Sequence, residues 1–255
     1  MRLKNKKVLV YGMGNSGQGA IKLLLKHKAK IYAYDDNYKM VENLPDNIIK
    51  VENITENFLK QIDLIVLNPS VSMYSENIKL ALLLNKKIIS EIELAFLFKK
   101  GNIISITGSN GKSTTSTLIY NILKQADIKA SLVGNIGNSF SGEVSNNKKQ
   151  TYVVEVSSFQ LETSNKYNSK IACFLNFTEN HLDRHFSLKE YFETKLKIFQ
   201  NQSRKDFSVL NYDDEKVRNI TTKSNTYYFS KNSKVKGVYV FNNYIYFNNE
   251  KTEEK

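Results

Sequence analysis

The sequence predicts an α/β protein with two successive domains, each built around a mainly parallel sheet. Short apolar runs alternate with amphipathic stretches along most of the chain, which is typical of βαβ units. The glycine-rich turn Gly12–Gly17 follows the first apolar run, and a second glycine loop, Thr107–Thr114, follows a later one. We therefore predict a Rossmann-like domain in residues 1–92 and a P-loop-type α/β domain in residues 93–255.

The first ninety residues contain buried apolar runs, typical of strands, and stretches with apolar residues at helical spacing. The expected strands are Lys7–Tyr11, Lys30–Tyr34, Leu64–Leu67 and Lys87–Ile89, and the expected helices are Gly17–Lys28 and Asn77–Leu84. A further helix, Glu91–Lys99, leads to Gly101, after which the alternation starts again.

The second part repeats the pattern and then changes character. The expected strands are Ile103–Thr107, Tyr152–Val156, Lys170–Phe177 and Ser208–Leu210, and the expected helices are Ser113–Ala126 and Leu188–Phe199. The last stretch predicts three short strands, Thr226–Phe229, Val238–Phe241 and Tyr244–Phe247, the last two joined by an Asn-Asn turn. We expect the charged tail Asn248–Lys255 to fray.

The amino-acid composition limits the classes of protein to which the chain can belong. The chain has 255 residues, of which 41% are hydrophobic, enough for a substantial core. The single cysteine, Cys173, cannot form an internal disulfide, and no run approaches the roughly 20 apolar residues of a membrane span. The basic N-terminus is followed by an apolar run too short for a signal peptide. We expect a cytoplasmic monomer without a membrane span.

The net charge of +12 admits two interpretations. A strongly basic protein can bind nucleic acid. Here the lysines are spread along the whole chain, and no basic stripe is interleaved with aromatic residues. We therefore favour solvated, lysine-rich faces, and we expect no nucleic-acid partner.

The turn Gly12–Gly17 has the form of a dinucleotide-binding fingerprint. It follows a strand and opens a helix, and Asp35 stands about twenty residues further on, at the end of the next strand. The free N–H groups and the positive end of the helix dipole would attract a phosphate. The pattern favours a nucleotide or diphosphate ligand over a purely structural turn.

The loop Thr107–Thr114 is the stronger signal. Its backbone N–H groups could cradle the phosphates of ATP, with Lys112 on the outer phosphates and the Ser113 hydroxyl on Mg²⁺. The expected ATP-binding residues are Gly108, Ser109, Asn110, Gly111, Lys112, Ser113 and Thr114. The loop departs from the standard pattern because Ile106 occupies the first glycine position. Its place between a strand and a helix makes a chance Gly-Lys-Ser turn the weaker explanation.

Three further segments carry polar groups beside predicted strands. Glu155 ends an apolar strand, where a carboxylate is costly unless it is paired or binds a metal. The cluster Asn176–His185 follows another strand and holds two of the three histidines. The third segment is the amphipathic helix Tyr191–Phe199, in which Lys195 would by itself be interpreted as a surface lysine. We assign no role to His27, on the inner face of a helix.

These motifs together resemble the Mur ligase family, in the right order and over essentially the whole chain. The resemblance implies that Ser113 and Glu155 hold one Mg²⁺, and that His181 holds a second with Lys195 converted to a carbamate. The implied catalytic residues are Lys112, His181 and Lys195. Asn180 stands where many relatives have aspartate.

The resemblance also implies a site for a UDP-linked substrate. The implied contacts are Asn15, Ser16, Asp35, Asp36, Ser70, Asn135, Ser157 and Gln160. Asn15 and Ser16 lie at the phosphate turn, and Asn135 lies in a Gly-Asn-Ile-Gly segment that would contact the muramoyl group. Ser70 replaces a glycine of the relatives.

The chain is most similar to the family members that add D-glutamate to UDP-N-acetylmuramoyl-L-alanine in peptidoglycan precursor synthesis. The implied activity is an ATP- and Mg²⁺-dependent amide ligation through an acyl phosphate. Relatives continue beyond 255 residues with a third domain that binds the amino acid. We therefore expect a chain truncated in its second domain, which binds the UDP substrate but does not ligate D-glutamate.

Two alternatives stay open. An NAD-linked oxidoreductase would explain Gly12–Gly17 but leaves Lys112, Glu155 and His181 without a role. A non-catalytic UDP-sugar- or ATP-binding fragment would explain both glycine motifs.

Overall fold

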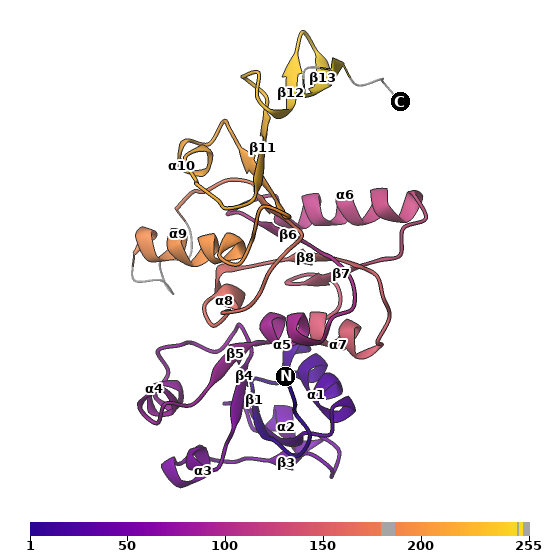
Figure 1. Cartoon of the computed structure of the whole chain (residues 1–255). Helices are drawn as coiled ribbons and strands as arrows, with labels where there is room; N and C mark the ends of the chain where they lie inside the picture. The colour runs from indigo at the N-terminus through magenta and orange to yellow at the C-terminus, as the bar shows by residue number, and fades with distance from the viewer. Residues whose placement is uncertain (180–186, 249, 252–255) are drawn as a thin grey trace. The chain divides into compact units, whose positions relative to one another are not determined.

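A computed structural model gives the fold and describes residues 1–179, 187–248 and 250–251 (Figure 1). The chain forms two compact units. The N-terminal unit contains Met1–Lys100, Val133–Lys149 and Phe159–Tyr167. The C-terminal unit contains Gly101–Leu132, Gln150–Ser158 and Asn168–Lys255. The units are therefore interleaved along the sequence, because two short segments beyond residue 132 pack into the first unit.

The N-terminal unit is built around a five-stranded parallel sheet in the order β3-β2-β1-β4-β5. Its strands are β1 (Lys7–Tyr11), β2 (Lys30–Tyr34), β3 (Ile49–Lys50), β4 (Leu64–Leu67) and β5 (Ile88–Ser90). The chain crosses from one side of β1 to the other between β3 and β4. The carboxyl ends of β1 and β4 therefore form a topological switch point, where open α/β sheets bind ligands.

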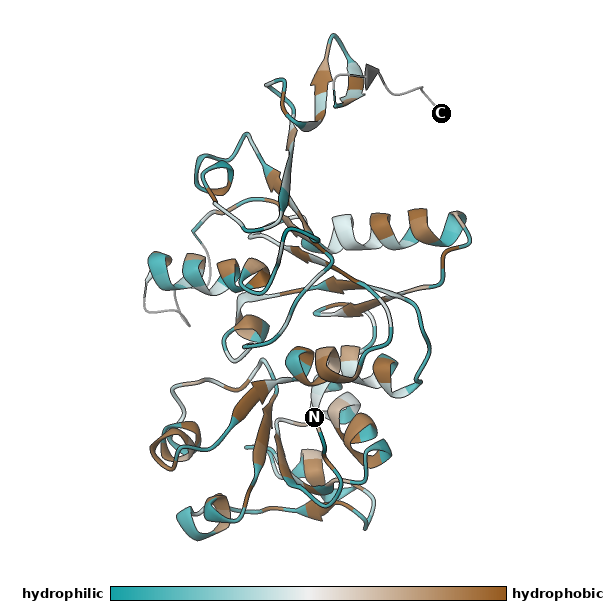
Figure 2. Ribbon diagram, in the orientation of Figure 1, coloured by the Kyte–Doolittle hydropathy of each residue, from teal (hydrophilic) through white to brown (hydrophobic). Residues whose placement is uncertain are grey.

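The helices of this unit follow from apolar spacing and from caps. They are α1 (Asn15–Lys26), α2 (Lys39–Glu42), α3 (Glu56–Lys60), α4 (Glu76–Leu83), α5 (Glu91–Phe98) and α7 (Phe140–Ser145). The Thr55 side chain caps α3, the Ser90 side chain caps α5, and the Ser139 side chain caps α7. Beneath them the strands are strongly apolar (Figure 2), with Leu9, Ile65 and Leu67 in the buried core.

The C-terminal unit contains most of a nine-stranded sheet in the order β14-β13-β12-β11-β10-β9-β6-β8-β7. Its strands are β6 (Ile103–Thr107), β7 (Ala130–Gly134), β8 (Thr151–Glu155), β9 (Ile171–Phe174), β10 (Phe207–Asn211), β11 (Asn225–Ser230), β12 (Gly237–Phe241), β13 (Tyr244–Phe247) and β14 (Glu250–Lys251). Neighbouring strands pair in parallel from β8 to β12, and the pairs β12–β13 and β13–β14 are antiparallel. The predicted α/β class with parallel sheets is confirmed.

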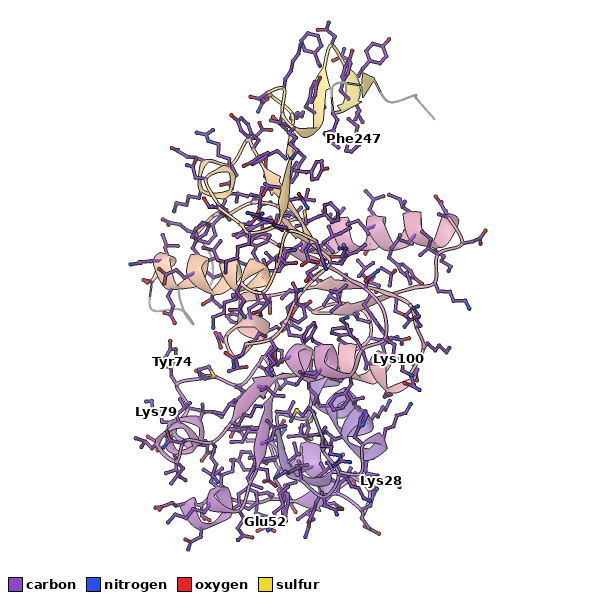
Figure 3. All side chains as sticks on the ribbon, in the orientation of Figure 1. Lys28, Glu52, Tyr74, Lys79, Lys100 and Phe247 are labelled. Carbon is purple, nitrogen blue, oxygen red and sulfur yellow. The ribbon has the colours of Figure 1, made fainter. Side chains whose placement is uncertain are left out.

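The remaining helices are α6 (Lys112–Gln125), α8 (Ser158–Leu161), α9 (Leu188–Leu196) with the 3₁₀ turn η1 (Lys197–Phe199), and α10 (Glu215–Arg218). Strands β6, β8 and β9 supply the buried residues Ile106, Val153 and Cys173 to the core beneath α6. The β12–β13 hairpin is less covered, and Phe247 is exposed there (Figure 3).

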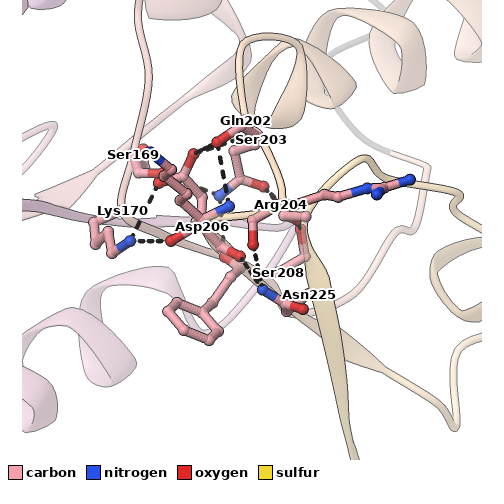
Figure 4. A network of polar contacts seen from close by, with 11 residues as sticks. Ser169, Lys170, Gln202, Ser203, Arg204, Asp206, Ser208 and Asn225 are labelled. Atoms are coloured by element: carbon pink, nitrogen blue, oxygen red, sulfur yellow. Dashed lines mark hydrogen bonds and ion pairs between the residues drawn. The ribbon is translucent and has the colours of Figure 1, made fainter.

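A buried polar network ties the amino ends of β9, β10 and β11 together (Figure 4). The Gln202 amide nitrogen donates to the carbonyl oxygens of Ser169 and Phe207 at 3.1 and 3.0 Å. Its amide oxygen accepts from the hydroxyls of Ser208 and Ser224 at 2.8 and 3.0 Å. The network satisfies these buried groups and fixes the strands in register, so that their carboxyl ends present the next loops together.

Candidate functional sites

The predicted phosphate turn lies at the switch point of the N-terminal sheet. Gly12 has φ of +94°, and a Cβ on it would lie 2.6 Å from the Asn68 Cβ. A Cβ on Gly17 would lie 2.0 Å from the Gly12 carbonyl oxygen. The turn is therefore too tight for side chains at either position. It delivers Asn15 and Ser16 to the first turn of α1, whose N–H groups can bind an anion.

A pocket of about 310 Å³ opens beside this turn. Its lining comes from the ends of β1 and β2 and from the loop after β4: Tyr11, Gly12, Asp35, Asp36, Ser70, Val71, Ser72 and Ser75. The structure therefore brings together three residues that the sequence predicts for the UDP substrate, namely Asp35, Asp36 and Ser70.

The two aspartates have different surroundings. The Asp35 carboxylate accepts the Met13 N–H at 2.7 Å and the Asn37 N–H at 2.9 Å, so it braces the glycine turn. The Asp36 carboxylate accepts the Tyr11 hydroxyl at 2.9 Å. Burial raises the pKa of Tyr11 to about 12, so the hydroxyl remains a hydrogen-bond donor.

The segment that carries Asn135 joins the same unit from far along the sequence. The Asn15 side chain donates to the Gly137 carbonyl oxygen at 3.3 Å. Close contact between α1 and α7 supports this link, because a Cβ on Gly19 would lie 1.9 Å from the Ser139 hydroxyl oxygen. Asn135 is exposed in the connecting loop. The predicted phosphate turn and the predicted muramoyl-binding segment are thus adjacent.

Two other predicted contacts follow β8. Ser157 is half-buried and belongs to the C-terminal unit. Gln160 is buried in α8 and belongs to the N-terminal unit, where its carbonyl oxygen accepts the Ser164 hydroxyl at 2.9 Å.

The predicted ATP loop connects β6 to α6 in the C-terminal unit. Gly108 and Gly111 have φ of +153° and +77°, and Gly111 is the N-cap of α6. The Lys112 ammonium donates to the carbonyl oxygens of Gly108 and Ser109 at 3.0 and 2.8 Å. Burial lowers the pKa of Lys112, and the Glu155 charge opposes this shift. Ser113 and Thr114 are exposed at the start of the helix.

A second segment braces the loop. The Asn176 amide accepts the Asn110 N–H at 2.8 Å and donates to the Asn110 carbonyl oxygen at 3.0 Å. The Ser109 N–H donates to the Asn176 carbonyl oxygen at 3.0 Å, and the Ser109 hydroxyl bonds both the N–H and the carbonyl of Thr178 at 3.0 Å. These bonds hold the loop open across the ends of β6 and β9.

The bracing roles of Asn176 and Asp214 were not predicted from the sequence. The Asp214 carboxylate accepts the Phe177 N–H at 2.7 Å, so it holds the other end of the same segment. The available signal was a short polar residue two or three positions after each of the strands β9 and β10, because the carboxyl ends of parallel strands meet at one edge.

Glu155 and Lys195 lie beside this loop. Glu155 ends β8, pairs with Ile106 of β6 across the sheet and is only 1% exposed. Its carboxylate and the Ser113 hydroxyl are oxygen ligands of the kind that Mg²⁺ prefers. A buried carboxylate close to a lysine at a phosphate loop fits a magnesium site.

Lys195 is buried rather than on the surface. Its ammonium donates to the Gly108 carbonyl oxygen at 3.0 Å and lies 4.7 Å from the centre of the Tyr191 ring. Burial, together with the nearby charge of Lys112, lowers the pKa of Lys195 to about 7. Lys195 therefore lies next to the phosphate loop, which supports the role near the phosphates that the resemblance implies for it. His181 and Asn180 lie outside the described residues.

Within the part of the chain that the structure describes, none of the helices has the length and hydrophobicity needed to span a bilayer.

Comparison with known proteins gives the family. Residues 106–253 match the Mur ligase middle domain, and residues 6–90 match the Mur ligase MurD-like N-terminal domain. The chain belongs to the Mur ligase family. Among curated relatives, it is 37% identical to the UDP-N-acetylmuramoylalanine–D-glutamate ligase of Thermoanaerobacter sp. (strain X514), covering 100% of this chain and 59% of that protein. The equivalent ligase of Clostridioides difficile (strain 630) is 40% identical over 96% of this chain and 57% of its own length.

Solved structures agree on the fold. The Mur-family ligase from Neisseria meningitides, described as a UDP-N-acetylmuramate:L-alanyl-gamma-D-glutamyl-meso-diaminopimelate ligase, aligns with a TM-score of 0.58 at 14% identity, over 97% of this chain and 86% of that one. A murein peptide ligase from Psychrobacter arcticus aligns with a TM-score of 0.59 at 14% identity, over 96% and 59%. The chain spans a little under three fifths of the length of the curated Mur ligases it matches.

Proposed function

We propose that this chain carries the UDP-substrate site and the ATP site of a ligase that joins D-glutamate to UDP-N-acetylmuramoyl-L-alanine. The observation that carries the proposal is the phosphate loop of the C-terminal unit, where Lys112 and Lys195 both donate to the Gly108 carbonyl oxygen and the charge of Glu155 acts on Lys112. In an NAD-linked oxidoreductase these residues would have no role.

The proposed reaction first gives the alanyl carboxylate a good leaving group. An amine cannot displace oxide from a carboxylate, so the alanyl carboxylate first takes the γ-phosphoryl group of ATP and becomes an acyl phosphate. The D-glutamate amine then attacks the carbonyl carbon, the C–O bond to phosphate breaks, and the amine loses a proton. The chain contributes positioning and charge stabilisation to these steps.

Each residue of the loop has a proposed part in this reaction. Backbone N–H groups from Gly108 to Thr114 bind the phosphates, and Lys112 turns from the loop carbonyls to the outer phosphates. Mg²⁺, when held by Ser113 and Glu155, would neutralise phosphate charge. Lys195 as a carbamate and His181 are the proposed ligands of a second Mg²⁺.

The N-terminal unit takes the UDP end of the substrate in this proposal. Asn15 and Ser16 bind the diphosphate at the helix N-terminus, and Asp35, Asp36 and Ser70 line the pocket beside it. The exposed Asn135 is proposed to contact the muramoyl part, and Ser157 and Gln160 are each proposed as a further contact of the UDP substrate.

Binding of Mg-ATP to the 255-residue chain tests the loop. Lys112→Ala should weaken binding about 10- to 100-fold, because it removes a charge-assisted contact to the outer phosphates. Lys124→Ala is the matched control, since Lys124 is an exposed lysine in the last turn of the same helix. Equal affinities of the two variants in calorimetry would refute the loop assignment.

A further inference from the structure

The C-terminal unit has a second pocket, which lies between α9 with η1 and the segment that begins with α10. The connections β9–α9–β10 and β10–α10–β11 both join neighbouring parallel strands, and such crossovers are right-handed, so the two helices lie on the same face of the sheet (Figure 1). The pocket has a volume of about 470 Å³, which is large enough for a small molecule. None of the described residues that line it belongs to the proposed ATP or UDP-substrate site.

The pocket combines an apolar surface with two positive charges. The apolar lining residues are buried or half-buried, and they are Phe192, Leu196, Phe199 and Ile220. Lys216 and Lys223 are exposed at the same pocket. The other described lining side chains carry amides or hydroxyls, so no carboxylate from the described part of the chain lines the pocket. An apolar wall with a few polar groups is typical of small-molecule sites.

The apolar wall is the edge of an aromatic cluster. The ring centroid of Phe174 lies 5.9 Å from that of Phe192 and 6.5 Å from that of Phe199. Phe192 also meets Phe177 edge to face, with 4.8 Å between centroids. Aromatic rings pack favourably in offset and edge-to-face arrangements at such distances. The two phenylalanines of the wall therefore favour a ligand that contains an aromatic ring, because the ring would extend the cluster.

The two lysines determine the charge of the ligand. Neither Lys216 nor Lys223 forms an ion pair or donates a side-chain hydrogen bond to a residue that the structure describes. The Lys216 ammonium lies 5.0 Å from the centre of the Phe177 ring. Each ammonium has three donors, so both can bind an anion. A carboxylate would meet two cations here and no described carboxylate that repels it.

We propose that this pocket binds a small aromatic carboxylate, with the ring against Phe192 and Phe199 and the carboxylate between Lys216 and Lys223. The site is separate from the proposed ATP and UDP-substrate sites, and the inference does not depend on them.

The pocket is also linked to the segment that braces the phosphate loop. The Asp214 carboxylate caps α10 by accepting the Val217 N–H, and it accepts the Phe177 N–H at 2.7 Å. Phe177 therefore contacts the pocket through Phe192, Lys216 and Asp214. A ligand carboxylate that draws Lys216 from the Phe177 ring should change the environment of Phe177.

Calorimetry and NMR of the 255-residue chain with 2-naphthoate and 2-naphthamide test the proposal, because the two probes share a ring system and differ in charge. The parent should bind 2-naphthoate about 3- to 10-fold more tightly than 2-naphthamide, as expected for two exposed ion pairs. Addition of 2-naphthoate should shift the methyl signals of Leu196 and Ile220 and the N–H signal of Phe177.

The double variant Lys216→Gln, Lys223→Gln should lose the preference for 2-naphthoate and keep the parent's affinity for 2-naphthamide, which shows that the pocket is still folded. Lys129→Gln, at an exposed position in the same unit, should keep the parent's preference.

Equal affinities of the parent for the two probes would show that the lysines do not select the ligand, and would overturn the proposal. A preference retained in the double variant would overturn it as well. So would the absence of shifts at Leu196, Ile220 and Phe177 when 2-naphthoate is added up to its solubility limit.

Discussion

At the scale of single residues, the Gly108 carbonyl oxygen lies at the centre of the proposed ATP site. Lys112 and Lys195 both donate to it at 3.0 Å, so two cationic side chains share one acceptor. Their mutual repulsion contributes to the lowered pKa of Lys195. Lys195 is buried and Lys112 is half-buried, and a phosphate group placed at this point would relieve the repulsion between them.

Lys195 also gives a residue-scale prediction. A buried amine with a pKa near 7 is largely neutral at pH 8, and a neutral amine can attack CO₂, losing a proton to give a carbamate. In ¹³C-bicarbonate at pH 8, the chain should show a protein-bound carbamate signal by NMR that Lys195→Arg lacks. Lys189→Arg, which replaces an exposed lysine on α9, should retain the signal. A parent spectrum without this resonance would contradict the carbamate assignment.

At the scale of elements, the N-termini of α5 and α7 meet through one buried carboxylate. The Ser141 N–H donates to a Glu91 carboxylate oxygen, and the Ser141 hydroxyl donates to the Glu91 carbonyl oxygen at 3.1 Å. The other carboxylate oxygen is buried without a partner among the described residues. Burial raises the pKa of Glu91 to about 7, and the bonds from Ser141 partly oppose this shift.

This contact predicts a pH dependence of stability. The pKa of Glu91 is higher in the folded chain than in the unfolded one, so the unfolded chain releases its proton first as pH rises. The free energy of unfolding should therefore fall between about pH 4.5 and pH 7, by on the order of 2–3 kcal/mol from this group, and then level off.

Urea denaturation at pH 5 and pH 8 measures this effect. Glu91→Gln cannot ionise, so its loss of stability over this interval should be smaller than that of the parent. Glu76→Gln, at an exposed position on α4, should follow the parent. Identical pH dependence in Glu91→Gln and the parent would show that Glu91 is charged in the folded chain at both pH values.

The sequence predicted helices and strands well where the local hydrophobic pattern agrees with the packing in the fold. The strands β1, β2 and β4 have the predicted bounds: β1 and β4 are apolar runs that are almost wholly buried, and β2 alternates buried with more exposed residues. The helix predicted from Ser113 begins one residue earlier, at Lys112. Strand β9 ends at Phe174 rather than Phe177, because the next residues leave the sheet to brace the phosphate loop.

Elements fixed by distant contacts were missed. Helix α7 contains Gly142 and lacks a clear apolar period, and its close packing on Gly19 of α1 determines its position. The burial of Lys195 could not be predicted from the amphipathic pattern of its helix either. The Gly108 carbonyl oxygen that Lys195 contacts lies far away in the sequence. Site residues that follow strands were easier to predict as neighbours, because the carboxyl ends of parallel strands lie at the same edge of the sheet.

At the scale of the whole molecule, the N-terminal unit depends on later parts of the chain. The Glu93 carboxylate accepts the N–H groups of Lys166 and Tyr167 at 2.9 and 2.8 Å, and the Ser90 and Ser164 hydroxyls bond at 2.9 Å. These contacts are buried, as is the joint between Glu91 and Ser141. Residues 133–149 and 159–167 therefore complete the unit that the first hundred residues begin.

A fragment of residues 1–100 should consequently be less stable than the N-terminal unit in the full chain. Removal of the two segments exposes the side of α1 that packs on α7. It also removes the N–H groups that donate to the carboxylates of Glu91 and Glu93. Together these changes should lower the free energy of unfolding by roughly 3 kcal/mol or more. Its urea midpoint, followed by tyrosine fluorescence, should lie clearly below that of the parent. A fragment with the parent's midpoint would mean that the later segments contribute nothing to this unit.

We propose that this Mur ligase chain binds a UDP-linked muramoyl substrate through the glycine turn and pocket of its N-terminal unit. Calorimetric titration of the 255-residue chain with UDP-N-acetylmuramoyl-L-alanine, with NADH titrated in parallel, tests it most directly. We expect saturable binding of one substrate molecule per chain and no binding of NADH. Saturable binding of NADH, with no heat from the UDP substrate, would contradict it.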